Sequence, residues 1–255
     1  MTWCDKLAST PVVGLRFGLV HKSSNTILDQ LRPLFDSWVD GRQPKFSIEK
    51  QSAFGLVFIT DNGFRYTVDP GSVVVEFHHR WRLKPRSGSL PVAELLSQAR
   101  PYSELLEEAV ERLLHAVELI NGPGARPMHR LGIVTDTKVV ASDAPPGVRR
   151  LIAYVGRPWG GNMPYYSFDI AGTLGRSADH DDRCIHSVGM DELESNPDGL
   201  VTVRFDWQRH YTIARPLAIE AIRKQVAAGK KAALEYFEDV AEGSRFDEDI
   251  LRKST

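Results

Sequence analysis

Residues 100–122 read RPYSELLEEAVERLLHAVELING, and this stretch is the strongest indication of how the chain folds. Its apolar residues recur every three or four positions, which is the spacing of one face of an α-helix. They are Tyr102, Leu105, Leu106, Ala109, Val110, Leu113, Leu114, Val117 and Ile120. Glu104, Glu107 and Glu108 lie near the expected N-terminus, where the helix dipole favours acidic side chains. Asn121-Gly122 is a typical helix end. We therefore expect a long helix with one buried face.

The residues before this helix alternate as strands do. Strands are expected over residues 13–19, 54–58, 64–68 and 73–84. Residues 27–39 have helical spacing instead, with a kink expected at Pro33. The turn signal Asp61-Asn62-Gly63 joins two of the strands directly. Short turns between successive strands predict an antiparallel meander followed by the long helix.

The residues after the helix partly repeat this order. Strands are expected near residues 131–140, 165–174 and 201–213, with a short helix near 148–155 after the first of them. A last helix is expected to open with Pro216 in its first turn. The whole order is βαβββα followed by βαββα. It predicts an α+β fold of mostly antiparallel sheet with helices packed on one side. The halves, residues 1–122 and 123–255, form either two lobes or one continuous domain.

Composition excludes several classes of protein. Among 255 residues, 32 are Lys or Arg and 33 are Asp or Glu, so the net charge of −1 gives no overall attraction to nucleic acid or anionic lipid. No apolar run is long enough to cross a membrane. Cys4 and Cys184 are too few for a disulfide framework. The N-terminal residues lack the clean apolar block of an export signal, so we expect a cytoplasmic protein with reduced thiols.

Three segments together carry a resemblance to a family. The helix start Arg100-Pro101-Tyr102 is followed by HRLGIVTDTKV at residues 129–139, and a terminal helix containing Glu235-Tyr236-Phe237 precedes an acidic tail. This order resembles a sporadically distributed prokaryotic family of proteins of similar length. That family has a Pro-Tyr-aromatic helix start and a strand reading R-I-G-L-R-Y-I-N-R-I, and no activity is assigned to it. Its patchy distribution implies accessory genes, of the sort found in mobile or defence islands.

The densest group of potential metal ligands lies at residues 179–186, which read DHDDRCIH. His180, Asp182, Cys184 and His186 are the candidates, because imidazole, carboxylate and thiolate all bind transition metals. In a strand, Cys184 and His186 project on the same face, and His180 could fold back from a preceding loop. The alternative is a polar hairpin loop beside one small buried thiol.

Two further segments are candidates for binding a partner or an anion. Alternation along the strand expected over residues 73–84 places His78, Arg80, Arg82 and Lys84 on one face, with Arg86 after it. Such a strip suits phosphates, although an ordinary solvated strand face has the same composition. The glycine-rich loop at residues 156–166 offers Trp159 and Tyr165 as contact residues, or folds over its own core.

No catalytic or cofactor-binding motif occurs in the sequence, so we expect no cofactor. The sequence favours the hypothesis of a non-catalytic binding protein. Such a protein would act with a protein partner or with itself, as an accessory or defence-associated component. A metal-dependent hydrolase or nuclease is the first alternative; beyond the cluster above, Asp136, Asp169 and Asp206 in separate strands could converge on magnesium. A nucleic-acid-binding module is the second alternative.

Overall fold

The computed structural model describes residues 10–17, 46–52, 55–69, 71–78, 81–86, 89–95, 100–121, 127–140, 144–150, 166–193 and 196–242. In chain order the elements are β1 (Thr10–Phe17), β2 (Phe46–Ser52), β3 (Gly55–Thr60), β4 (Phe64–Asp69), β5 (Ser72–Phe77), β6 (Trp81–Arg86), β7 (Ser89–Leu95), α3 (Tyr102–Asn121), β8 (Pro127–Val140), β9 (Tyr166–Arg176), β10 (His180–Leu193), β11 (Asn196–Pro216) and α5 (Ile219–Glu242). This is an α+β fold, as the sequence predicts.

Nine of the strands form one antiparallel sheet in the order β2-β3-β4-β5-β1-β8-β11-β10-β9, and β6 and β7 form a separate two-stranded sheet. The first strand of each half lies at the centre, where β1 pairs with β8 and Gly14 lies opposite Gly132. From there the two halves extend outwards in the same manner, as β5-β4-β3-β2 and as β11-β10-β9. The two halves are therefore arranged in the same strand order on either side of the β1–β8 pair.

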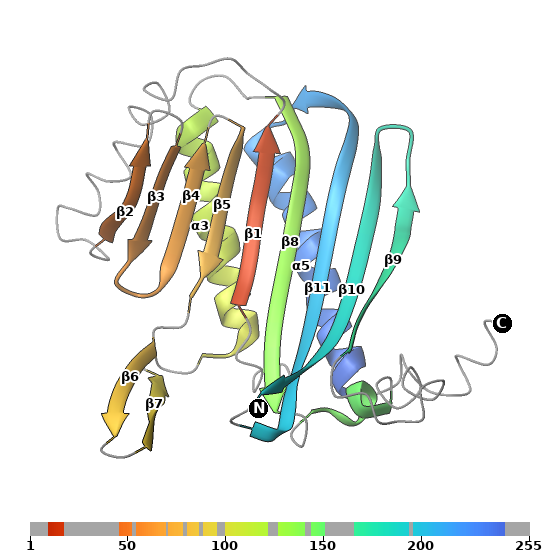
Figure 1. Cartoon of the computed structure of the whole chain (residues 1–255). Helices are drawn as coiled ribbons and strands as arrows, with labels where there is room; N and C mark the ends of the chain where they lie inside the picture. The colour runs from red at the N-terminus through yellow and green to blue at the C-terminus, as the bar shows by residue number, and fades with distance from the viewer. Residues whose placement is uncertain are drawn as a thin grey trace.

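Both long helices cover the same face of the nine-stranded sheet (Figure 1). Helix α3 packs on β5 and β1, and α5 packs on β11 and β8. We call this side of the sheet the helix face and the opposite side the open face. In the described part of the chain, no helix has the length and apolar character needed to cross a bilayer.

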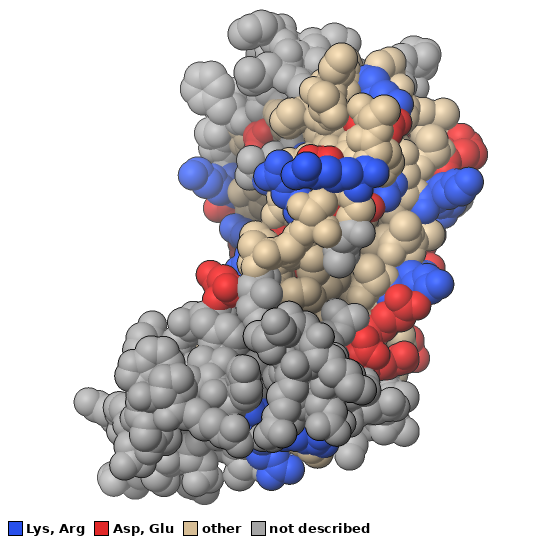
Figure 2. Space-filling model, turned by 90° about the vertical axis from the view of Figure 1, so that its right-hand side faces the viewer, with Lys and Arg blue, Asp and Glu red and all other residues tan. Residues whose placement is uncertain are grey.

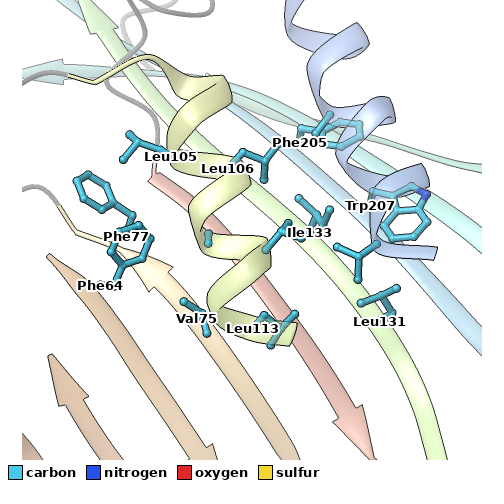
Figure 3. Packing of buried hydrophobic residues seen from close by; sticks show 14 of the residues in the cluster. Phe64, Val75, Phe77, Leu105, Leu106, Leu113, Leu131, Ile133, Phe205 and Trp207 are labelled. Atoms are coloured by element: carbon cyan, nitrogen blue, oxygen red, sulfur yellow. The ribbon is translucent and has the colours of Figure 1, made fainter. Parts of the chain in front are cut away.

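The core lies between the helix face and the two helices (Figure 3). Leu106 and Leu113 of α3 are fully buried against the sheet, and Ile133 of β8 and Trp207 of β11 join them from the second half. The strands alternate buried and partly exposed residues along β3, β4 and β5, because one face packs and the other does not. The predicted buried stripe of α3 is confirmed from Tyr102 to Val117, and the side chain of Ile120 lies outside the described part of the structure.

The single strand expected over residues 73–84 is wrong. Strand β5 ends at Phe77, and β6 pairs with β7 in the small sheet. The reason lies in the neighbouring turn. Gly63 adopts a φ of 94° there, and its carbonyl accepts a hydrogen bond from the His78 amide. Because β4 begins at Phe64, opposite Phe77, it offers no further partner for the chain beyond His78.

The second half contains one strand more than the sequence indicated. His180 begins β10 instead of lying in a loop, and Ser177 and Asp179 form the turn before it. Strand β11 continues through Pro216, so α5 starts at Ile219 and Pro216 is not in its first turn. The β11–β8 register shifts between His210 and Arg215, and Ile213, the last residue of the strand expected near 201–213, is 77% exposed.

Two expected helices are described only in part or not at all. Residues 146–150 are helical, which agrees with the start of the short helix expected near 148–155. The helix expected over residues 27–39 lies outside the described residues. β2 and β7 are strands that the alternation of the sequence did not indicate.

Gly229 lets α5 approach the sheet closely. A Cβ at this position would lie 2.5 Å from Cζ3 of Trp207 and 3.0 Å from Cδ1 of Ile133. Those atoms belong to buried side chains of the helix face. The glycine in the middle of α5 is therefore a packing requirement.

We predict that Gly229→Ala destabilises the protein by about 1–3 kcal/mol, because the methyl group overpacks the Trp207 ring. Helix propensity alone predicts the opposite sign, a gain of about 1 kcal/mol. Denaturant unfolding of the wild type and the variant decides between them. As a control, Ala228→Gly at the neighbouring exposed position should lose only the propensity difference.

Candidate functional site

The four candidate metal ligands lie on one face of β10, the helix face. His180, Asp182, Cys184 and His186 alternate along the strand opposite Tyr211, Arg209, Trp207 and Phe205 of β11. The shared face predicted for Cys184 and His186 is confirmed. A strand rises about 3.3 Å per residue, so the backbone positions of His180 and His186 are about 20 Å apart. Among the described residues, no three His, Cys, Asp or Glu side chains come together as a metal site.

Asp182 is instead held by an arginine. Both of its carboxylate oxygens accept hydrogen bonds at 2.6 Å, from Nε and Nη2 of Arg209. Both side chains are mostly buried, with exposed fractions of 13% for Arg209 and 19% for Asp182. Hydrogen bonding to Asp182 raises the pKa of Arg209. The Arg209 guanidinium also lies 5.6 Å from the Trp207 ring centre, so the pair continues the packing of the core along β10 and β11.

His180 belongs to the turn between β9 and β10. Its Nδ1 lies 2.8 Å from Oδ1 of Asp179 and 2.9 Å from Oγ of Ser177. Nη2 of Arg215 lies 2.6 Å from the other oxygen of Asp179. The Ser177 hydrogen bond first, then His180 and Arg215, hold the pKa of Asp179 well below its usual range. Because Ser177 and Asp179 both meet the same ring nitrogen, this trio lacks the relay geometry of a hydrolase triad.

Cys184 and His186 are packed into the core beneath α5. The Cys184 Sγ lies 3.3 Å from Nε2 of His186, and Cys184 is 1% exposed. The His186 ring contacts the rings of Tyr236 and Phe205, with centroids 4.5 and 5.7 Å away. A reactive thiol needs a partially exposed environment, and Cys184 does not have one.

We predict that Asp182→Ala costs about 1–3 kcal/mol of stability, because it leaves the Arg209 guanidinium largely buried without its partner. The double variant Asp182→Ala with Arg209→Met should recover part of this loss. Denaturant unfolding measures both effects. If chelator treatment of the wild type lowered its stability as much as Asp182→Ala does, Asp182 would be a metal ligand instead.

The cations that were predicted to form one strip do not lie on a single strand. His78 follows β5, and its Nε2 lies 3.1 Å from Oε2 of Glu76. Arg82, Lys84 and Arg86 lie on β6, where the backbone register places Arg82 opposite Glu94. Arg80, Trp159 and Tyr165 lie outside the described residues.

The structure reveals a different concave region, on the open face of the second half. A hollow of about 510 Å³ is lined by Ala171, Gly172, Thr173, Arg176, Arg183, Cys184, Ile185, Asp206, Gln208 and His210. We call it the open-face hollow. Alternation turns the Cys184 side chain to the helix face, so only its backbone faces the hollow.

Three rows of residues that run across β8, β11, β10 and β9 build this region. The first row is Val134, Asp206, Ile185 and Ala171; the second is Gly132, Gln208, Arg183 and Thr173; the third is Arg130, His210, Asp181 and Arg176. Small residues explain why the surface is hollowed. Gly132 has no side chain beside Gln208, and Ala171 carries only a methyl group.

Polar side chains on β11 form a connected chain along the hollow. Nε2 of Gln208 donates to Oδ1 of Asp206 at 2.7 Å. Oε1 of Gln208 accepts from Nη1 of Arg130 at 3.1 Å and lies 3.0 Å from Nε2 of His210. Asp206 is 7% exposed although it lies on the open face. The amide is therefore fixed between a carboxylate and two basic groups.

The electrostatic environment at one end of the hollow is positive. Burial first, then the charges of Arg183, Arg130 and His129, lower the pKa of His210, and among the principal causes only Asp181 raises it. Figure 2 views the molecule from the side of β9. Basic and acidic side chains lie side by side on that side of the molecule. The positive character is thus local, which is consistent with a net charge near zero.

The three strand carboxylates do not gather at one point. Asp136 of β8 and Asp169 of β9 lie in a fourth row, with Arg204 and Ser187 between them. Strands are about 4.8 Å apart, so the backbones of Asp136 and Asp169 are separated by about 14 Å. Only Asp206 lines the hollow.

Comparison with known proteins adds little. The sequence matches no protein-family model, and no curated protein is significantly similar to it. A search of solved structures finds a rolling circle replication initiator protein from Geobacillus stearothermophilus. It is 10% identical, and the match covers 80% of this chain and 76% of that one, with a TM-score of 0.28. A TM-score this low does not indicate a shared fold.

We predict that Arg183→Gln raises the pKa of His210, because one of the cations that disfavour its protonation is gone. The value should stay below the usual 6.5, since burial is the larger cause. A proton NMR titration of the His210 ring measures it, with Arg223→Gln on α5 as a control that leaves it unchanged.

The same shift has a consequence for stability. The pKa of His210 is lower in the folded than in the unfolded chain. The neutral ring therefore contributes fully to the free energy of unfolding above about pH 6.5, and this contribution is lost as the pH falls through the folded-state pKa. Arg183→Gln should reduce this acid-induced loss. An unchanged His210 pKa in Arg183→Gln would show that the Arg183 charge does not influence the His210 ring.

Proposed function

We propose that this protein works by binding rather than by catalysis, and that the open-face hollow holds a phosphate-bearing ligand. The observation that carries the proposal is a hollow of about 510 Å³ that has Arg176 at one end, Arg183 opposite Gln208 in the middle and the nearly buried Asp206 at the other end. Its volume lies in the range usual for ligand sites, roughly 300–1,000 Å³. Its surroundings combine small, apolar and oriented polar groups, as such sites do.

The charges favour an anion. Arg176 and Arg183 line the hollow, and Arg130 adjoins it through Gln208. Arginine binds phosphates and carboxylates through two parallel hydrogen bonds. Arg176 is well exposed, and its only described ion pair, with Asp181, has a separation of 3.9 Å. That loose contact leaves its guanidinium able to turn towards a ligand.

The size of the site favours a small phosphorylated group over an acidic protein surface. A stable protein–protein contact covers about 800 Å² on each partner, whereas the arginines here surround a local depression. A protein partner, which the sequence analysis favours, is therefore the alternative that the binding experiment described below can detect. Nucleic acid, the second alternative from the sequence, belongs to the phosphate-bearing ligands.

The contacts of the other candidates also support binding over metal-dependent hydrolysis. Asp182 and His180 each make close contacts with neighbouring side chains, and Cys184 is buried. Asp206 lies in a row without a second carboxylate, because its cross-strand neighbours are Val134 and Ile185. Two-metal hydrolysis requires several ligands around one point.

We predict that Arg183→Glu weakens binding of inorganic pyrophosphate at least about 10-fold, as expected for the loss of a charge-assisted hydrogen bond and the gain of a repulsive charge. Titration followed by backbone amide shifts measures the affinity and locates the site on β9, β10 and β11. Arg223→Glu is the matched control. It makes the same change of charge on α5, where Arg223 pairs with Glu111, and should leave binding intact.

Thermal unfolding should show both variants folded, since both arginines are exposed. Equal pyrophosphate affinity in the wild type and Arg183→Glu would contradict the proposal. So would binding of polyglutamate to the open face with no binding of pyrophosphate, which would favour an acidic protein partner.

A further inference from the structure

Asp206 lies at the end of the open-face hollow opposite Arg176, and this inference rests on the function proposed above. Its carboxylate is mostly buried, with a side-chain exposure of 10%. Oδ1 accepts the hydrogen bond from Gln208. Oδ2 forms an ion pair with Nη2 of Arg204 at 3.7 Å, a separation beyond hydrogen-bond distance. Among the described residues, no group donates a hydrogen bond to this oxygen.

A carboxylate in such a position favours a ligand that brings hydrogen-bond donors. Buried charged groups are stabilised when their oxygens accept hydrogen bonds, and the described neighbours supply only part of that need. Gln208 cannot turn to supply more, because its carbonyl oxygen already accepts from Arg130. Asp206 is therefore an oriented acceptor in front of an open volume.

The distance between the two ends of the hollow suits one nucleotide. The row of Asp206 and the row of Arg176 are four residues apart along the strands, or about 13 Å. Arg183 lies between them, opposite Gln208. A phosphate at the arginines therefore places a base edge near Asp206, while Ile185 and Ala171 offer apolar surface to the base.

We propose that the open-face hollow binds a nucleoside phosphate and selects guanine through Asp206. The Watson–Crick edge of guanine presents two adjacent donors, N1–H and the 2-amino group, which match the two oxygens of a carboxylate. Adenine and cytosine place a ring-nitrogen acceptor beside their amino group, and uracil flanks its single N–H with two carbonyl oxygens. Each of those edges brings an acceptor close to the Asp206 charge.

Calorimetric titration of the full chain with nucleoside monophosphates tests this selection. GMP should bind about 10- to 100-fold more tightly than AMP, the discrimination usual for one bidentate contact with a base. IMP, which lacks the 2-amino group, should fall between them. This series needs no variant, so the test does not depend on the folding of a mutant.

Variants then assign the selection to Asp206. Asp206→Asn keeps the shape of the side chain and should bring the GMP to AMP ratio close to one. Asp169→Asn is the matched control, because Asp169 is an exposed carboxylate of the open face outside the hollow, and its removal should leave the ratio unchanged. Guanosine without phosphate should bind more weakly than GMP.

The outcomes separate the two proposals. Equal affinity for GMP, IMP and AMP overturns the guanine selection but leaves phosphate binding standing. Pyrophosphate binding without any nucleotide binding also overturns the guanine selection and leaves phosphate binding standing. The absence of all phosphate binding overturns both the guanine selection and the proposed phosphate site. Comparing GMP with a short guanine-containing single strand shows whether the source is a free nucleotide or a nucleic acid; either result supports the selection if Asp206→Asn abolishes it.

Discussion

The antiparallel pairing of β1 with β8 is the contact on which the rest of the structure depends. It joins residues 10–17 to residues 128–136, across most of the first half of the chain. Without this pairing the two halves would be separate sheets of five and four strands. With it, α3 and α5 come to the same side and contact each other. In the described part of the chain, neither long helix lies on the opposite side of the sheet (Figure 1).

Strand β11 connects the core with the candidate site. Phe205 and Trp207 point to the helix face and are buried, whereas Asp206 and Gln208 point to the open face. The Trp207 ring lies where a side chain on Gly229 would have to fit. Helix α5 can therefore pack closely on β11 only because residue 229 has no side chain. A rigid, doubly paired strand holds polar side chains more accurately than a loop, which is what ligand recognition requires.

Much of the fold could be predicted from local periodicity. The spacing of apolar residues within α3 marks its buried stripe, and short turns join β3, β4 and β5 into a meander, so both were predicted correctly. The end of β5 at Phe77 was not, because it depends on where the adjacent strand turns at Gly63. Alternation continues through residues 78–84, and nothing local marks the change of partner.

The hollow was beyond sequence reasoning for a related reason. The alternation of residues 201–213 does place Asp206 opposite the buried Phe205 and Trp207, so its face was predictable. Its neighbours Arg183 and Gly132 come from β10 and β8, and the register between these strands is set by long-range pairing. The candidate ligands His180 and Cys184 project to the helix face, whereas Arg183, which lies between them on β10, lines the hollow.

We propose that the protein binds its ligand on the face of the sheet opposite α3 and α5. Ala171→Trp tests it most directly, because Ala171 is exposed on β9 within the hollow and an indole there would occupy the ligand volume. We expect an unchanged melting temperature together with the loss of pyrophosphate and GMP binding in calorimetric titration. Wild-type affinity in a folded Ala171→Trp variant would contradict it.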